Sequence, residues 1–278
     1  MPMALAAGAA LLVVAWLVAQ PILARRRRDA LRARPFPPEW DAILARRVPQ
    51  FRALPADLRA QLRANIQVFI GEKPFYGCDG IEITDEMRVT IAAQACLLIL
   101  NRRTDFFPNL REILVYPGAF IVDRVRAEPS GVLQEHRHVL SGESWSRGQV
   151  ILSWQDALDG AAVADDGRNV VIHEFAHQLD QEKGYANGAP WLGARKRYGR
   201  WSQVLAGEFA RLQYEAAWQL PSLFSYYGAT APAEFFAVAT EVFFEQGRRM
   251  ALEHPELHAE LRDLYRVDPQ HWEDGAAS

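Results

Sequence analysis

The feature that most constrains this chain is a pair of histidines spaced four residues apart. His173-Glu174-Phe175-Ala176-His177 lies in an apolar stretch that runs from Asn169 to Gln181. On a helix, residues four apart share one face, so both imidazoles can reach one ion, with Glu174 beside them. The apolar flanks favour a helix that is buried except for this stripe. The pattern therefore predicts a zinc-binding helix facing a cleft, and the alternative of two surface histidines without a ligand fits these flanks less well.

A zinc ion used in catalysis has three protein ligands and an open position for water. Asp180 follows His177 by three residues. It lies a further turn along the helix, too far to share the ion, so we assign it to hydrogen bonding at the helix end or behind a ligand. The third ligand must therefore come from another part of the chain.

A second helix, predicted over residues 232 to 246, offers three carboxylates. Glu234, Glu241 and Glu245 fall within about 40° of one another around the helix. The ordinary interpretation is a solvated helix edge, but the surrounding phenylalanines favour burial. Periodicity leaves open which carboxylate meets the metal. Pro232 suits the first helical turn, which favours Glu234 as the ligand and a deeper Glu241 that orients a ligand histidine.

The N-terminal region predicts a membrane anchor. The 22 residues from Met3 to Ala24 carry no charge and would make about 33 Å of helix. A cleaved signal peptide would carry its positive charges before a shorter apolar run, and a buried globular helix would show a polar stripe. Arg25 to Arg28 follow the run, which predicts a cytoplasmic domain and a single-pass inner-membrane protein. The Pro35-Phe36-Pro37-Pro38 segment is then a stiff linker.

Composition narrows the class of protein further. The chain is 50% hydrophobic and 23% charged, enough to bury a core, and its formal net charge is -3. Six arginines against one aspartate in residues 1–34 leave the remainder acidic, which argues against nucleic acid as the partner. Two cysteines, Cys78 and Cys96, cannot make a disulfide framework, so we expect a buried thiol in a reducing compartment.

The order of predicted elements indicates one α+β domain over residues 35–278, after an anchor and basic flank over residues 1–34. Helices are expected from residue 55 and from a Thr84 cap to about Leu100. A small sheet of three to four strands is expected around residues 113–116, 119–122 and 150–154. Helical periodicity returns in the C-terminal part of the chain, over residues 169–181, 201–218, 232–246 and 255–265.

Four separated motifs resemble the Mlc titration factor A family of zinc-dependent peptidases. They are Asn169-Val-Val-Ile-His173-Glu-Phe-Ala-His177-Gln-Leu-Asp180, the Ser141-Gly-Glu-Ser-Trp145 turn, the Leu114-Val-Tyr-Pro-Gly-Ala-Phe120 hairpin and Ala231-Pro-Ala-Glu234-Phe-Phe-Ala-Val238. The resemblance spans about residues 38 to 270. It implies a zincin-like metallopeptidase domain with a core similar to the anthrax lethal factor protease domain, an aminopeptidase-type activity, and, for enteric members, binding of a glucose-responsive repressor.

By the same resemblance, His173, His177 and Glu234 are the metal ligands, Glu174 is the general base, and Tyr227 donates a hydrogen bond at the reacting centre. Tyr227 is otherwise an ordinary aromatic in an aromatic-rich segment. Family members can carry a further metal-contacting histidine, at a position that aligns with Gln134 here, with His136 and His138 nearby.

Zinc held by two imidazoles and one carboxylate would activate water, and Glu174 would pass its proton to the leaving amine, hydrolysing a peptide or protein substrate. The alternative function is a non-catalytic protein that sequesters a transcriptional regulator and keeps the metal for structure or control. The open ligand position favours the hydrolase.

Overall fold

The computed structural model describes the chain except for residues 1, 103–104, 128–132, 141, 146–147 and 273–278. Side chains of residues 2–15, 18, 120–127, 133–140 and 142–145 also lie outside the described part. The chain is mostly helical, with helices α1 Pro2–Arg32, α2 Pro38–Arg47, α3 Pro49–Ala53, α4 Ala56–Glu72, α5 Asp85–Leu97, α6 Trp154–Ala162, α7 Val170–Asp180, α8 Tyr198–Ala217, α9 Pro232–Glu245, α10 Gly247–Glu253 and α11 Pro255–Tyr265. Short 3₁₀ turns are η1 Arg195–Arg197, η2 Tyr226–Ala229 and η3 Pro269–His271.

The main sheet has four strands in the order β1-β2-β6-β5. Their bounds are β1 Phe75–Gly77, β2 Glu112–Tyr116, β6 Gln149–Ser153 and β5 Gly142–Trp145. The first three strands run parallel and β5 runs antiparallel to β6. Parallel neighbours need a crossover, and α5 lies between β1 and β2 in the chain. Buried Ile113, Val115, Val150 and Leu152 place the sheet within the core.

The predicted α+β arrangement of helices, then a sheet, then helices, is corrected by this topology. β1 precedes α5, so one helix lies between two strands of the main sheet, and the chain is mostly helical. The expected hairpin at Leu114 to Phe120 is also wrong. β2 belongs to the main sheet, whereas β3 Phe120–Ala127 pairs with β4 Leu133–Leu140 in a separate two-stranded sheet. The expected turn at residues 141–145 is the strand β5 over its described residues.

The expected transmembrane anchor, and with it the single-pass inner-membrane location, is corrected as well. Within the residues that the structure describes, no helix combines the length and the apolar character needed to cross a membrane. The charge-free run begins in the part of α1 whose side chains are not described.

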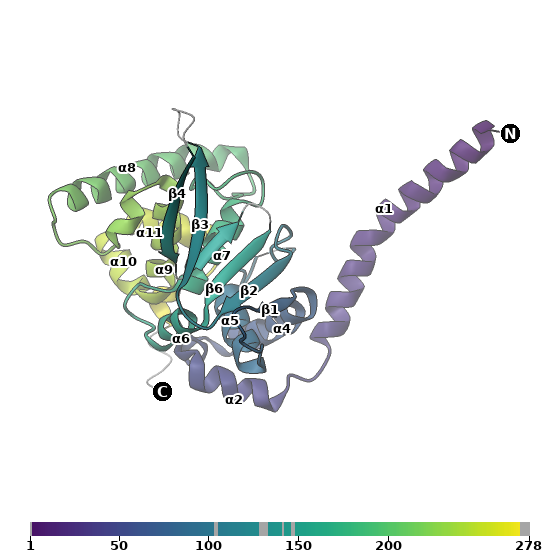
Figure 1. Cartoon of the computed structure of the whole chain (residues 1–278), viewed down its shortest axis with the longest axis horizontal. Helices are drawn as coiled ribbons and strands as arrows, with labels where there is room; N and C mark the ends of the chain where they lie inside the picture. Colours follow the sequence, from purple (N-terminus) through teal and green to yellow (C-terminus); the bar gives the residue numbers. More distant parts are fainter. Residues whose placement is uncertain (1, 103–104, 128–132, 141, 146–147, 273–278) are drawn as a thin grey trace.

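The arginines after this stretch are used in part to attach α1 to α4. Arg27 Nη2 donates to the carbonyl of Gly71 at 3.0 Å, and Arg28 pairs with Glu72 at 2.8 Å and with Asp105 at 3.1 Å. Figure 1 shows α1 projecting away from the body toward its N-terminus. The basic run therefore has a structural role in docking the end of α1.

Helix α7 lies at the centre of the molecule, and its apolar side chains pack against the surrounding helices and strands. Phe175 is fully buried and its ring centroid lies 5.6 Å from that of Phe69 and 4.9 Å from that of Phe107. α7 contacts β5, β6, α5, α6 and α9. In Figure 1 the C-terminal helices α8 to α11 gather on one side of the body, and α2, α4 and α5 on another. Among the described residues of α7, Val170, His173 and Glu174 line a cavity.

Candidate metal centre

The two histidines of α7 are brought together with one carboxylate of α9. His173 Nε2 lies 3.1 Å and His177 Nε2 lies 3.3 Å from Glu234 Oε2. One ligand atom from each of the three residues can be chosen so that all lie within 4.8 Å of one another. The three residues predicted as ligands therefore converge, although α7 and α9 are far apart in the sequence.

This donor set fits a zinc ion. Two imidazole nitrogens and a carboxylate oxygen are the ligands of many catalytic zinc sites. Ligands about 2.0 Å from a tetrahedral ion are separated from one another by about 3.3 Å, which matches the separations between Glu234 and the two histidines. Both imidazoles are nearly buried, at 9% exposure for His173 and 8% for His177, so water competes little for these nitrogens.

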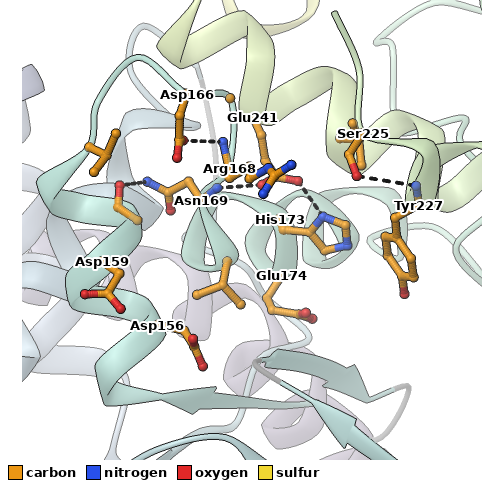
Figure 2. Close-up of a pocket in the computed structure, with 15 residues that line it drawn as sticks. Asp156, Asp159, Asp166, Arg168, Asn169, His173, Glu174, Ser225, Tyr227 and Glu241 are labelled. Atoms are coloured by element: carbon orange, nitrogen blue, oxygen red, sulfur yellow. Dashed lines mark hydrogen bonds and ion pairs between the residues drawn. The ribbon is translucent and has the colours of Figure 1, made fainter. Parts of the chain in front are cut away.

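A second carboxylate of α9 holds the ring of His173 from behind. Glu241 Oε1 lies 2.7 Å from His173 Nδ1, and Glu241 Oε2 accepts from the backbone N–H of Asn169 at 2.5 Å. A hydrogen bond at Nδ1 fixes the tautomer that leaves Nε2 as the ligand atom. The orienting contact expected for Glu241 is thus present, and in Figure 2 Glu241 lies between Asn169 and His173.

The third carboxylate of the stripe, Glu245, is remote from the three converging ligands. Its oxygens accept from the backbone N–H of Arg168 at 3.0 Å and from Asn169 Nδ2 at 2.9 Å. Glu241 and Glu245 are only 7% and 4% exposed. The ordinary interpretation of the stripe as a solvated helix edge is therefore wrong.

The contacts shift the pKa of His173 and that of Glu234 in opposite directions, each toward the charged form of the side chain. Burial lowers the pKa of His173, but the charge of Glu241 and the hydrogen bonds from Glu234 and Glu241 outweigh it and raise that pKa well above the usual value. Burial raises the pKa of Glu234, but hydrogen bonds from both histidines outweigh it and lower that pKa. The carboxylates thus favour the protonated form of His173, and the two histidines favour the ionised form of Glu234.

Asp180 closes the C-terminal end of α7, as expected. Its carboxylate accepts from the backbone N–H groups of Asn187, Gly188 and Ala189 at 2.6 to 2.9 Å. Gly188 has φ +78, and an added Cβ would lie 2.6 Å from the carbonyl oxygen of Pro232. This loop therefore packs against the first turn of α9, the turn that carries Glu234.

Tyr227, which lies on η2, is next to His173. Its ring centroid is 5.8 Å from that of His173, and its side chain is half exposed. Tyr227, His173 and Glu174 line one cavity of about 690 Å³, together with residues of α6 and of the loop before α7. Figure 2 shows Tyr227 and Glu174 on two sides of His173. Substrate in this cavity could meet both side chains.

The sequence did not predict the contacts of Asn169, and the predictions for Gln134, His136 and His138 are not tested. Asn169 was expected only as the start of a helix, which an asparagine before an apolar periodic run indicates. Its links to Glu241 and Glu245 join distant parts of the chain and have no local signal. The side chains of Gln134, His136 and His138 lie outside the described residues.

A helix carrying His-Glu-x-x-His, joined by a glutamate from another helix, is the ligand arrangement of a metallopeptidase. Comparison with known families supports this class. The family described as glucose-regulated metallo-peptidase M90 matches residues 22–266. The chain therefore belongs to the glucose-regulated metallo-peptidase M90 family.

Individual relatives cover most of the chain. An uncharacterized protein of Synechocystis sp. is 42% identical over 258 residues, which is 92% of this chain and 94% of the relative. Mlc titration factor A of Salmonella agona is 34% identical over 233 residues, covering 83% of this chain and 86% of the relative. The protein of the same name from Salmonella typhi has the same identity and coverage. The resemblance to the Mlc titration factor A family is thus confirmed.

Proposed function

We propose that this chain is a zinc-dependent peptidase of the aminopeptidase type, with its peptidase domain over residues 35–278. The observation that carries the proposal is the convergence of His173, His177 and Glu234. His173 also lines a cavity together with Glu174. The three side chains would hold the ion and leave a position open toward the cavity. The substrate class is peptide or protein, in keeping with a metallopeptidase family.

His173, His177 and Glu234 would hold a zinc ion, and the chemistry it would supply is a lower pKa for a coordinated water and polarisation of a carbonyl oxygen. Glu174, which is next to a ligand on α7 and 4% exposed, takes a proton from the attacking water and gives it to the leaving amine. The hydroxyl of Tyr227 donates a hydrogen bond to the carbonyl oxygen as negative charge develops there. Glu241 keeps the ring of His173 in one orientation throughout the cycle.

The proposal is tested by assaying the purified full-length chain on aminoacyl and peptide substrates. Activity should be lost in a chelator and restored by zinc. Glu174→Gln keeps the size of the side chain and the three ligands but removes the base, so the rate should fall by about 100-fold or more while zinc is retained. Glu256→Gln, at an exposed position of α11, is the matched control and should leave the rate unchanged. Unchanged turnover of Glu174→Gln with metal bound would exclude Glu174 as the base.

A second candidate function rests on the names of the relatives, which are called Mlc titration factor A. This chain would then bind a transcriptional regulator of the Mlc type and hold the metal for structure. Gel filtration of the chain with a purified Mlc protein, in zinc and in chelator, tests that binding. Complex formation by a chain that hydrolyses none of the assayed substrates would favour this second function over the first.

A further inference from the structure

Glu245 is a buried carboxylate for which the proposed reaction has no use. It lies at the end of α9, beyond Glu241, and does not belong to the group of converging ligands. Burying a carboxylate is costly unless hydrogen bonds compensate it, and an apolar side chain would fill the same space without that cost. Its two hydrogen bonds both lead to the residues just before α7, Arg168 and Asn169.

Asn169 joins three helices through its own polar atoms. Its Oδ1 accepts from the backbone N–H of Ile172 at 3.0 Å, which caps α7. Its Nδ2 donates to the carbonyl of Gly160 on α6 at 3.1 Å and to Glu245 on α9 at 2.9 Å. Its backbone N–H donates to Glu241. A cap needs only the oxygen of the side chain, so the amide nitrogen serves a different purpose.

The contacts continue without a break to the candidate metal centre. Glu245 bonds the side chain of Asn169, the backbone of Asn169 bonds Glu241, and Glu241 bonds His173 Nδ1. α6 lies close behind this chain of contacts, because an added Cβ at Gly160 would be 3.1 Å from the Cα of Asn169. A shift of Asn169 would therefore move the hydrogen-bond donor of Glu241 and, with it, the orientation of the imidazole.

We propose that Glu245 and Asn169 are positioning residues of the metal centre, which lock the start of α7 to α9 so that Glu241 holds His173 Nε2 toward the ion. The proposal rests on the assignment of His173 as a ligand in the proposed function. In this proposal Glu245 affects the geometry of the ligands through hydrogen bonds. It contacts neither the metal nor the substrate.

The experiment compares three variants of the full-length chain loaded with Co²⁺, whose visible absorption spectrum reports ligand geometry. Glu245→Gln keeps the shape but loses one of the two acceptors. Asn169→Ser keeps an oxygen that can cap α7 but loses the amide donor. Thr240→Val is the matched control, because Thr240 is also buried on α9 and bonds the hydroxyl of Tyr265, away from the carboxylate stripe.

Both test variants should alter the Co²⁺ spectrum and weaken metal affinity about 3-fold to 10-fold in a chelator series, less than the 10-fold to 100-fold of a direct ligand partner. Thr240→Val should lower the melting temperature without changing spectrum or affinity. The proposal is overturned if Glu245→Gln and Asn169→Ser keep the wild-type spectrum and affinity, or if Thr240→Val changes the spectrum equally.

The readouts separate this proposal from the proposed function. A wild-type chain that binds Co²⁺ and shows the expected changes in the variants, but hydrolyses no peptide, supports the positioning role and counts against the peptidase. A chain that hydrolyses peptides while both test variants keep their metal geometry supports the peptidase and overturns the positioning role. A wild-type chain that binds no Co²⁺ overturns the positioning role as well, because it has no ligand to position.

Discussion

Helix α9 has two faces that are buried to a similar degree but are chemically opposite. One face presents Glu241 and Glu245 to the start of α7, at 7% and 4% exposure. The other presents aromatic rings to α11, and Phe243 there is fully buried against Tyr265, with ring centroids 5.6 Å apart. Aromatic packing stabilises a fold directly, whereas buried carboxylates are compensated only by well-placed donors. The aromatic face thus explains why α9 stays in place, and the acidic face explains what it positions.

The largest expected effect is a loss of stability when the aromatic face of α9 is disrupted by a substitution at Phe243. Phe243 packs against Phe244, His258 and Tyr265, with ring centroids 5.3 to 5.6 Å away. Phe243→Ala should lower the free energy of unfolding by about 3–5 kcal/mol through lost burial and a cavity. Urea denaturation measures this loss. At temperatures where the variant is folded, its metal content after dialysis should equal that of wild type. If Phe243→Ala lost metal without a loss of stability, the aromatic face would also be needed for metal binding.

The next largest effect is a loss of zinc affinity when carboxylates of the acidic face are removed. It tests how much each of the three carboxylates contributes to metal binding. Glu234→Ala removes a proposed ligand and should lower zinc affinity the most. Glu241→Ala removes the partner of His173 Nδ1 and should lower it about 10-fold to 100-fold. Glu245→Ala should lower zinc affinity the least of the three, because Glu245 reaches His173 only through Asn169 and Glu241. Zinc content after dialysis against a graded chelator series gives the order, and full occupancy in Glu234→Ala would move the third ligand to another residue.

The two faces of α9 also show what the sequence could predict. The stripe of carboxylates and the proline at its start favoured Glu234 as a ligand and Glu241 as the residue behind it, since helical spacing is a local property. The family resemblance also placed Glu234 as a ligand, and both roles stay predictions. The convergence of α7 with α9 could be expected only because His173 and His177 require a third ligand. The aromatic face was recognised as buried, but periodicity does not identify α11 as its partner.

Other parts of the chain were not predictable from local pattern. Pro117-Gly118 is typical of a hairpin turn, yet β2 pairs with β1 and β6, which lie far away in the sequence. Parallel strands cannot be joined by a tight turn, so their pairing leaves no turn signal. Here α5 connects β1 to β2, and β3, β4 and β5 lie between β2 and β6 in the chain. The charge-free N-terminal run predicted an anchor from hydropathy alone, while the use of Arg27 and Arg28 in docking α1 depends on Gly71 and Glu72 of α4.

The smallest expected effect is a pH dependence of the free energy of unfolding that comes from Glu245 on the acidic face. Burial, with the nearby charges of Glu241 and Asp166, raises the pKa of Glu245 to about 8, against hydrogen bonds from Asn169 and Arg168 that lower it. An unfolded glutamate titrates near 4.3. Between these values the folded chain binds a proton that the unfolded chain releases, so the stability due to this group falls as pH rises from about 4.5 to 8.

Glu245→Gln cannot titrate and should lack this contribution. The free energy of unfolding, measured in urea with chelator present so that metal binding does not contribute, should fall from pH 5 to pH 8 more steeply in wild type than in the variant, by about 1 kcal/mol or more. Other titrating groups, His173 included, are common to both chains and largely cancel in the difference. Parallel curves for the two chains would mean that Glu245 is ionised in the folded state across this range, and that its donors compensate its burial fully.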